Sequence, residues 1–265
     1  MSGNAGTLLA AEEWHAPGLW LFQWKPLVEI GPFGITKPMI LAFIVVLVVI
    51  GFFWAAFSKP QPVPKGAQMW GEYAYTFVRD QIARPMIGKD GDKYLPLLFT
   101  LFVFVWIMNL MSVIPLAQFP VTSRIAYPAA LAIMVYLYML YLGFKHQGFL
   151  GFFKNKLFPP GMPKWIYIIL APLEFLTNFI VNPFTHAVRL FGNMFAGHIL
   201  IAMFAITGYH FLVVAVSPLG LPLGIVGAVM TVVMVAFELL IQALQAYVFA
   251  MLAANYIGGA VHAEH

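Results

Sequence analysis

The chain has 265 residues, of which 62% are hydrophobic and 9% are charged, with 14 basic and 10 acidic side chains. Soluble domains carry about 45–50% apolar and about 25% charged residues, so the composition argues against a soluble globule and against intrinsic disorder. The absence of cysteine excludes disulfides, thiolate metal sites and cysteine nucleophiles. The net charge of +4 does not indicate a nucleic-acid partner, because long apolar stretches separate the basic residues.

Five stretches are apolar enough to cross a bilayer, whose hydrocarbon core of roughly 30 Å takes about 20 helical residues. The alternation of polar and apolar residues that is typical of a membrane β-barrel is absent. We therefore predict an all-α polytopic membrane protein, with an external segment at 1–37 and a single membrane domain at 38–265. The predicted membrane helices are 38–57, 94–116, 125–145, 165–208 and 221–259.

Residues 67–87 have two faces at helical spacing, which predicts an amphipathic helix lying in the membrane interface. A short soluble helix docked on a partner is the alternative. The more polar face holds Glu72, Thr76, Arg79, Asp80 and Ala83, and the apolar face holds Trp70, Tyr73, Ala74, Phe77, Val78 and Ile82.

The distribution of Lys and Arg predicts the orientation, because cytoplasmic loops hold the excess of basic residues. Ten basic residues fall in the segments 58–93 and 145–164, whereas the opposite side holds Lys25, Lys37 and Arg124. This pattern puts the N-terminus outside and the C-terminus in the cytoplasm. One basic residue, Arg189, belongs to neither side.

The last two predicted helices are longer than a bilayer requires. Residues 223–258 contain no proline, and 36 helical residues would measure about 54 Å. An apolar helix projecting into water is costly, so we expect both helices to be steeply tilted in the membrane. Pro172 and Pro183 are candidate kinks in the earlier of the two.

Two charges lie far inside these helices, where an ionisable group is costly and usually marks a pathway. Arg189 stays protonated in proteins, so it acts as a fixed cation rather than as a proton relay. Glu238 forms a polar stripe at i, i+4 and i+7 with Gln242 and Gln245, which suits a hydrated lining. A buried salt bridge between Arg189 and Glu238 is the alternative.

Further polar residues accompany these charges. Asn193 shares a face with Arg189, whereas His198 lies nine residues on, about half a turn around the helix. His198 could instead be a hydrogen-bonded interior imidazole, and the amides could be ordinary interhelical hydrogen-bonding groups. The candidate path residues are His198, Glu238, Gln245, Gln242, Asn193, Asn109 and Glu174. Near Glu174, the residues Asn178, Asn182, Thr185 and His186 add polarity toward the cytoplasmic half. No phosphate loop, metal-ligand cluster or nucleophile motif is present, so no cofactor and no metal are expected.

The nine residues at 189–197, Arg-Leu-Phe-Gly-Asn-Met-Phe-Ala-Gly, resemble the signature of subunit a of F-type ATP synthases. The resemblance covers roughly residues 63–265. Weaker matches follow in the same order: Asn-Leu-Met at 109–111 with Ile-Pro at 114–115, Leu-Glu at 173–174, and Leu-Gln-Ala-Tyr-Val-Phe at 244–249.

The resemblance implies a proton-translocating stator subunit in a bacterial plasma membrane, with no enzymatic activity on its own. It implies that Arg189 faces a rotating ring of c subunits and attracts the essential carboxylate of that ring. Two aqueous half-channels would end near Arg189 without meeting, and the tilted helices would follow the curved ring. The implied partners are the c-ring, the peripheral-stalk b subunits, the rest of the ATP synthase and the lipid bilayer, with no nucleic acid.

One departure from the resemblance concerns the proton path. Some relatives have Glu nine residues after the arginine and His at the position of Glu238, whereas this chain has His198 and Glu238. The exchange suggests that the two residues work together in one half-channel. A secondary transporter or another ion-conducting protein is the alternative function, although no internal repeat typical of transporters is evident. A purely structural membrane scaffold is the third possibility.

Overall fold

The computed structural model describes residues 16–22, 26–30, 33–58, 60–114, 117–158, 163 and 165–262. The basic residues Lys25, Lys59 and Lys164, which contributed to the predicted orientation, lie outside the described residues. Most of the predicted external segment and Pro115 of the family-like Ile-Pro pair also lie outside them.

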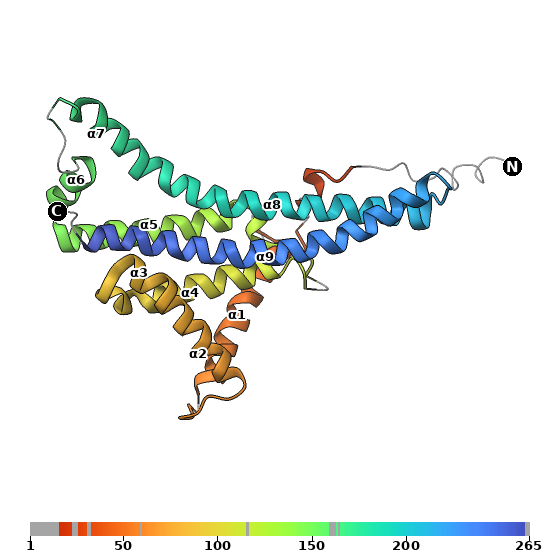
Figure 1. The fold of residues 1–265 in the computed structure, drawn as a ribbon, viewed down its shortest axis with the longest axis horizontal. Coiled ribbons are helices and arrows are strands. Elements are labelled where there is room, and N and C mark those ends of the chain that lie inside the picture. The colour runs from red at the N-terminus through yellow and green to blue at the C-terminus, as the bar shows by residue number, and fades with distance from the viewer. Residues whose placement is uncertain are drawn as a thin grey trace.

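The described chain is built almost entirely of helices (Figure 1). Five helical runs are long and apolar enough to cross a membrane, which confirms the predicted all-α polytopic class. The α-helices are α1 (Lys37–Phe57), α2 (Ala67–Val78), α3 (Arg84–Ile87), α4 (Gly91–Leu110), α5 (Ala126–Gln147), α6 (Phe149–Leu157), α7 (Tyr167–Leu176), α8 (Asn182–Tyr209) and α9 (Gly220–Val261).

Helices α8 and α9 lie side by side along the longest dimension of the molecule, and α4 and α5 run beside them (Figure 1). Helix α1 runs across this direction. Helices with such different directions cannot all be perpendicular to one bilayer, so some of them must be tilted. The core lies where α4, α5, α8 and α9 meet, and buried alanines of α9 such as Ala250 and Ala253 let the helices approach closely.

The backbones of α8 and α9 touch at a pair of glycines. A Cβ atom on Gly227 would lie 2.6 Å from the backbone N of Gly208, and one on Gly208 would lie 2.9 Å from the N of Ala228. No side chain fits into that space. The glycines therefore fix the antiparallel pairing of the two helices, in the manner of small-residue contacts in other membrane proteins.

The predicted helix 165–208 is one helical run from Tyr167 to Val214. It contains two π-helical turns, η5 (Thr177–Val181) and η6 (His210–Val214), and α7 bends away from α8 in Figure 1. Pro183 lies in the first turn of α8, directly after η5. Because proline lacks an N–H donor, it disturbs the hydrogen bonds of the preceding turn, which explains a bend at this point.

The predicted interfacial segment 67–87 consists of α2, the π-turn η2 (Arg79–Ala83) and α3, and a 3₁₀ turn, η3 (Gly88–Asp90), leads into α4. Trp70 and Tyr73 are exposed. Asp80 pairs with Arg79 at 2.9 Å and Arg84 pairs with Asp92 at 2.9 Å. Exposed aromatic rings beside charged side chains are typical of a helix in a membrane interface, and this placement stays a prediction.

Several short elements were not predicted from the sequence. Near the N-terminus, the 3₁₀ turn η1 (Leu19–Phe22) precedes an antiparallel pair of strands, β1 (Val28–Ile30) and β2 (Phe33–Ile35). A further 3₁₀ turn, η4 (Val121–Ser123), precedes α5. Helix α6 follows α5 and lies within the basic segment 145–164. Helix α9 also continues two residues past 259, where the predicted helix ends. Gly258 allows close packing, because a Cβ there would lie 2.6 Å from the carbonyl oxygen of Met86.

Candidate functional site

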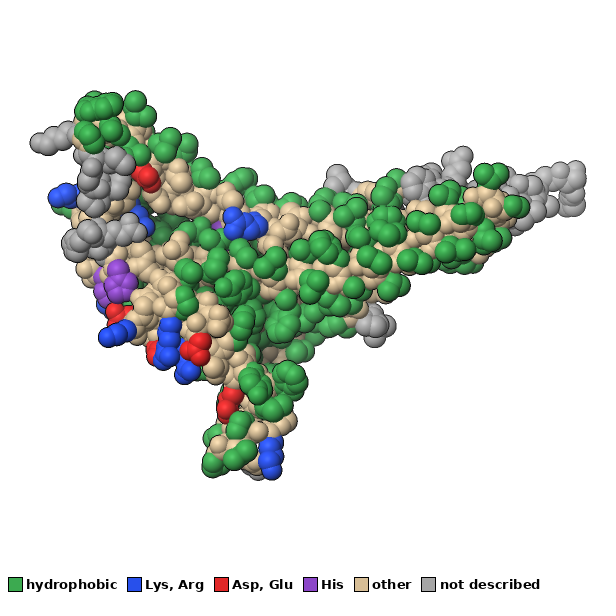
Figure 2. Space-filling model, in the orientation of Figure 1, with side chains coloured by type: hydrophobic (Ala, Val, Ile, Leu, Met, Phe, Trp, Pro, Cys, Tyr) green, Lys and Arg blue, Asp and Glu red, His purple; other side chains and the backbone are tan. Residues whose placement is uncertain are grey.

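Arg189 lies on an exposed side of α8, one turn after the exposed residue Thr185. It is the only basic residue in α8, and no ion pair or hydrogen bond of its side chain occurs within the described residues. Figure 2 shows basic and acidic side chains gathered mainly around α2–α4 and α6–α7, with a basic area over α8 set apart from them. Asn193, one turn further on, is also exposed. The cation is thus presented outward, with polar and apolar neighbours but no partner.

The predicted alternative of a buried Arg189–Glu238 salt bridge is wrong. Within the described residues no ion pair joins the two, and Glu238 is buried at 3% exposure whereas Arg189 is exposed. The antiparallel register explains the separation. Gly197 of α8 lies opposite Glu238, so Arg189 lies two turns away along α8 from the level of Glu238.

A small pocket joins Arg189 to α9. Its lining includes Arg189 and His186 from α8 and Gln245 and Phe249 from α9. Gln245 is therefore the member of the predicted polar stripe that lies beside the arginine. His186 packs on Phe249 with 3.9 Å between ring centroids, so the α9 wall of the pocket is partly aromatic.

The other two members of the stripe belong to a largely buried polar cluster between the end of α4, η4 and α9. We call it the outer cluster, after the side of the membrane on which the sequence predicts it to lie: Asn109, Ser112, Thr122, Glu238 and Gln242. The Nε2 atom of Gln242 donates to Ser112 at 2.5 Å and to Glu238 at 3.3 Å. The hydroxyl of Thr122 donates to Asn109 at 2.6 Å, and Asn109 donates to the backbone oxygen of Gln242 at 3.4 Å. Interhelical hydrogen bonds are therefore one function of Asn109 and Gln242, as the alternative reading of these amides held.

His198 faces away from Arg189 and lies near two aromatic rings, one of η1 and one of the connection between α4 and α5. Its ring centroid is 5.8 Å from that of Phe22 and 6.2 Å from that of Phe119. It follows Gly197, which contacts the Glu238 side chain, so His198 and Glu238 lie at the same level of the helix pair. No hydrogen bond between them occurs within the described residues.

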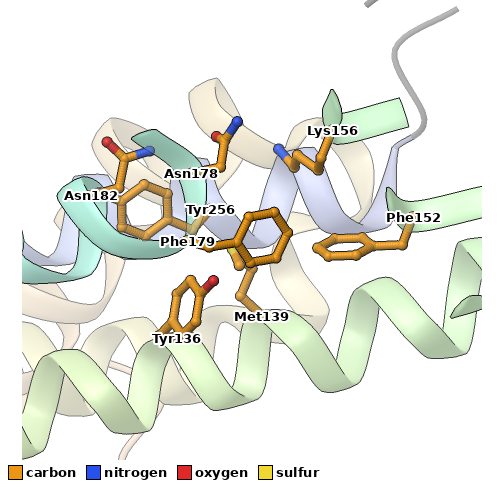
Figure 3. Close-up of a pocket in the computed structure, with 8 residues that line it drawn as sticks. All are labelled: Tyr136, Met139, Phe152, Lys156, Asn178, Phe179, Asn182 and Tyr256. Atoms are coloured by element: carbon orange, nitrogen blue, oxygen red, sulfur yellow. The ribbon is translucent and has the colours of Figure 1, made fainter. Parts of the chain in front are cut away.

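Glu174 lies at the other end of the helical run, where α7 meets η5. It accepts a hydrogen bond from Asn178 at 2.8 Å. Asn178 and Asn182 border a second pocket, of about 20 Å³, whose opposite walls come from α5, α6 and α9 (Figure 3). The amine of Lys156 is turned toward Asn178 in this view. Tyr136 and Tyr256 complete the polar lining of the pocket.

The structure therefore separates the predicted path residues into three places. Asn109, Gln242 and Glu238 are together, with His198 at their level; Arg189, Asn193 and Gln245 are near one another; and Glu174 lies apart. The sequence did not indicate that Ser112 and Thr122 belong to the outer cluster or that Tyr136 and Lys156 line the second pocket. Their neighbours there lie on other segments of the chain, and a single hydroxyl or lysine has no recognisable pattern in the sequence around it. No group of three metal-binding side chains occurs within the described residues.

A sequence model of the ATP synthase A chain family matches residues 39–258. The chain belongs to this family. The relatives are each called ATP synthase subunit a: that of Streptomyces lividans is 50% identical, over 94% of this chain and 88% of its own length. Those of Frankia alni and Rhodococcus erythropolis are each 40% identical, over 97% of this chain and 90% and 94% of their own lengths.

Membership in the ATP synthase A chain family agrees with the resemblance at 189–197 and with the five apolar helical runs. The protein is thus a multi-pass membrane protein of this family. The matched region includes Arg189, Glu238 and every other candidate path residue, so the site lies within the family's own fold.

Proposed function

We propose that this chain is the proton-translocating stator subunit of an ATP synthase in a bacterial plasma membrane, with its N-terminus outside and its C-terminus in the cytoplasm. It has no catalytic activity on its own. The observation that carries the proposal is Arg189, a permanent cation exposed on an apolar helix face without any partner in the described chain. Such a charge is costly in a bilayer unless another group meets it.

The group that meets Arg189 is, in this proposal, the carboxylate of a c-ring that turns past α8 and α9. The exposed surface of these helices carries bulky apolar residues such as Phe184, Leu240 and Leu244. Close to Arg189, however, the exposed side chains on α8 are small. A Cβ atom on Gly192 would meet open space, which leaves room for a neighbouring helix. The guanidinium attracts the ring carboxylate, stabilises its ionised form and so promotes release of its proton.

Two half-channels bring protons to and from this point. The outer one uses His198, Glu238 and the hydrogen-bonded amides of the outer cluster. The cytoplasmic one begins near Glu174 and the pocket in Figure 3. Gln245 and Asn193 lie beside Arg189, between the two channels, where amides solvate charge without titrating. Arg189 itself prevents a continuous leak, because a fixed cation repels protons and hydrated cations.

The shape of the helix pair supports the same arrangement. Helix α9 has 42 residues, about 63 Å at 1.5 Å per residue, so it fits within a bilayer only when it is tilted. A tilted pair lies along the curved outside of a ring and keeps contact with several ring helices. The peripheral-stalk b subunits and the remaining ATP synthase subunits would hold the chain still while the ring turns.

The test is the variant Arg189→Ala in the complete complex, reconstituted in vesicles, with Lys145→Ala as the control. We expect the Arg189 variant to assemble but to lose ATP-driven proton pumping, because nothing then stabilises the ionised ring carboxylate. The control removes an exposed cation at a helix end and should pump normally. Normal pumping by an assembled Arg189→Ala complex would contradict the proposal, and so would solute uptake by the purified chain alone.

A further inference from the structure

His186 is a buried histidine that the proposed function leaves without a role. Its side chain is 2% exposed, and neither ring nitrogen has a hydrogen-bond partner within the described residues. Buried polar groups are nearly always hydrogen-bonded, so an exception in a folded protein calls for a functional explanation or for unseen water. Phe and Leu would pack against the Phe249 ring without that cost.

The position of His186 connects the two pockets. It lines the small pocket together with Arg189, three residues further along α8. On its other side, Asn182 is one helical turn earlier and lines the larger pocket with Asn178. Tyr256 also lines the larger pocket, and its ring centroid is 5.7 Å from that of His186. His186 therefore separates the arginine from the polar space that leads toward Glu174.

The groups around this histidine are few. Arg189 shares its helix, and Tyr256 faces it from α9. Tyr136 of α5 and Lys156 of α6 border the adjoining pocket, and Glu174 follows beyond Asn178. Unlike the fixed cation Arg189, the neutral imidazole of His186 can accept a proton on a ring nitrogen and give it up again.

We propose that His186 is the innermost proton-carrying side chain on the cytoplasmic side of Arg189. The proposal rests on the function proposed above. When the ring carboxylic acid reaches Arg189, its O–H bond breaks and an N–H bond forms on the neutral imidazole of His186. The carboxylate left behind pairs with Arg189. The imidazolium then gives one proton to water beside Asn182 and returns to the neutral form, so charge and protons balance over one ring step.

The nearby guanidinium gives this transfer its direction. Arg189 repels a second positive charge on His186, so the imidazolium is short-lived and its proton moves toward the pocket. Pumping driven by ATP uses the same steps in reverse. A proton from the cytoplasm reaches His186 through the pocket and is then handed to the ring carboxylate.

The main experiment compares His186→Gln with the parent complex in reconstituted vesicles, and measures ATP-driven pumping at a series of cytoplasmic pH values. We expect a loss of roughly tenfold, less than the roughly 100-fold of a sole acid–base group, because water in the passage carries part of the flux. The remaining activity should differ from the parent in its dependence on cytoplasmic pH, because an amide does not titrate. His210→Gln, in the same helical run but beyond the glycine contact, is the matched control and should keep both the rate and the pH profile.

Chemical rescue separates proton transfer from a purely structural role. In His186→Ala, added imidazole should restore part of the flux, whereas pyrazole, which has the same shape but is a far weaker base, should not. Equal rescue by both compounds would show that the side chain only fills space and would overturn the proposal. A His186→Gln complex with parental rate and pH profile would overturn it as well.

The Arg189→Ala complex distinguishes this failure from a failure of the proposed function. If Arg189→Ala stops pumping while His186→Gln behaves like the parent, the stator function stands and only the role of His186 is wrong. If Arg189→Ala pumps normally, both proposals fail.

Discussion

The two polar regions of the membrane domain differ in how completely the chain satisfies them. In the outer cluster, Asn109, Thr122, Ser112 and Gln242 hydrogen-bond to one another from different parts of the chain, and among the described residues only Oε2 of Glu238 and Oε1 of Gln242 are left without a partner in it. Around Arg189 the chain supplies no partner within its described residues, and Asn193 is exposed beside it. The outer cluster links α4 and α9 through its own hydrogen bonds, whereas we propose that the arginine region is completed by a partner that packs against it.

The strongest way to break this contrast is to change the type of cation. We expect Arg189→Lys to lose nearly all ATP-driven pumping, although the positive charge remains. Lysine lacks the planar fork that binds a carboxylate with two hydrogen bonds, is more strongly hydrated and can lose its proton in an apolar site. Pumping in reconstituted vesicles, normalised to assembled complex, is the measurement. A rate within a factor of two of the parent would mean that any cation suffices.

The contrast also predicts unequal effects on stability for two asparagines. Asn109→Leu removes the acceptor of the Thr122 hydroxyl and should lower the free energy of unfolding by about 1–2 kcal/mol, because a buried hydroxyl is left unpaired. Asn193→Leu changes an exposed amide and should stay within about 0.5 kcal/mol. Denaturation of the purified chain in detergent measures both. Equal losses would show that the two regions do not differ in the proposed way.

Much of this arrangement could be predicted from the sequence. Apolar stretches of sufficient length predicted the five membrane-crossing runs, since burial in lipid leaves little choice of structure. The stripe at 238, 242 and 245 also follows from helical spacing. What could not be predicted is which neighbours each residue meets. Gln245 lies beside Arg189 in the register of α8 and α9 in which Gly208 meets Gly227. Gln242 meets Ser112 because α9 also packs against the end of α4, and neither contact has a local sequence pattern.

The elements that were not predicted also lack a recognisable local pattern in the sequence. The β1–β2 pair, η1 and α6 are short and lie outside the long apolar runs, where periodicity says little. The π-turns of the Tyr167–Val214 run are likewise invisible to a pattern of 3.6 residues. His186 was noticed only as general polarity, and its burial without hydrogen-bond partners emerged from packing against Phe249.

A double-mutant cycle tests whether two residues near the outer cluster act together in proton transfer. His198 and Glu238 lie at one level of the helix pair, and we predict that they act together in the outer half-channel. The exchange His198→Glu with Glu238→His should retain more pumping than the two single changes predict, with a coupling of about 1 kcal/mol. Additive losses would indicate independent roles. Each variant is measured against assembled complex, so that a failure to assemble is not counted as a loss of transfer.

The mildest test uses single cysteines, because the chain contains none of its own. Cysteines at Glu238 and Gln242 should react with a water-soluble thiol reagent added from outside, and cysteines at Asn178 and Asn182 with reagent added from the cytoplasmic side. Leu190, an apolar residue adjacent to Arg189, lies at the level of the expected barrier and should be protected from both. Each substitution is compared for labelling rate in the complete complex, and only variants that still assemble are counted.

Two reactive groups with a gap at the level of Arg189 are expected, because a continuous aqueous pore would dissipate the roughly 2.3 kcal/mol that 100 mV supplies per charge. Reactivity that runs unbroken from Glu238 to Asn178 would contradict two separate half-channels and would leave Arg189 without its role as the barrier between them.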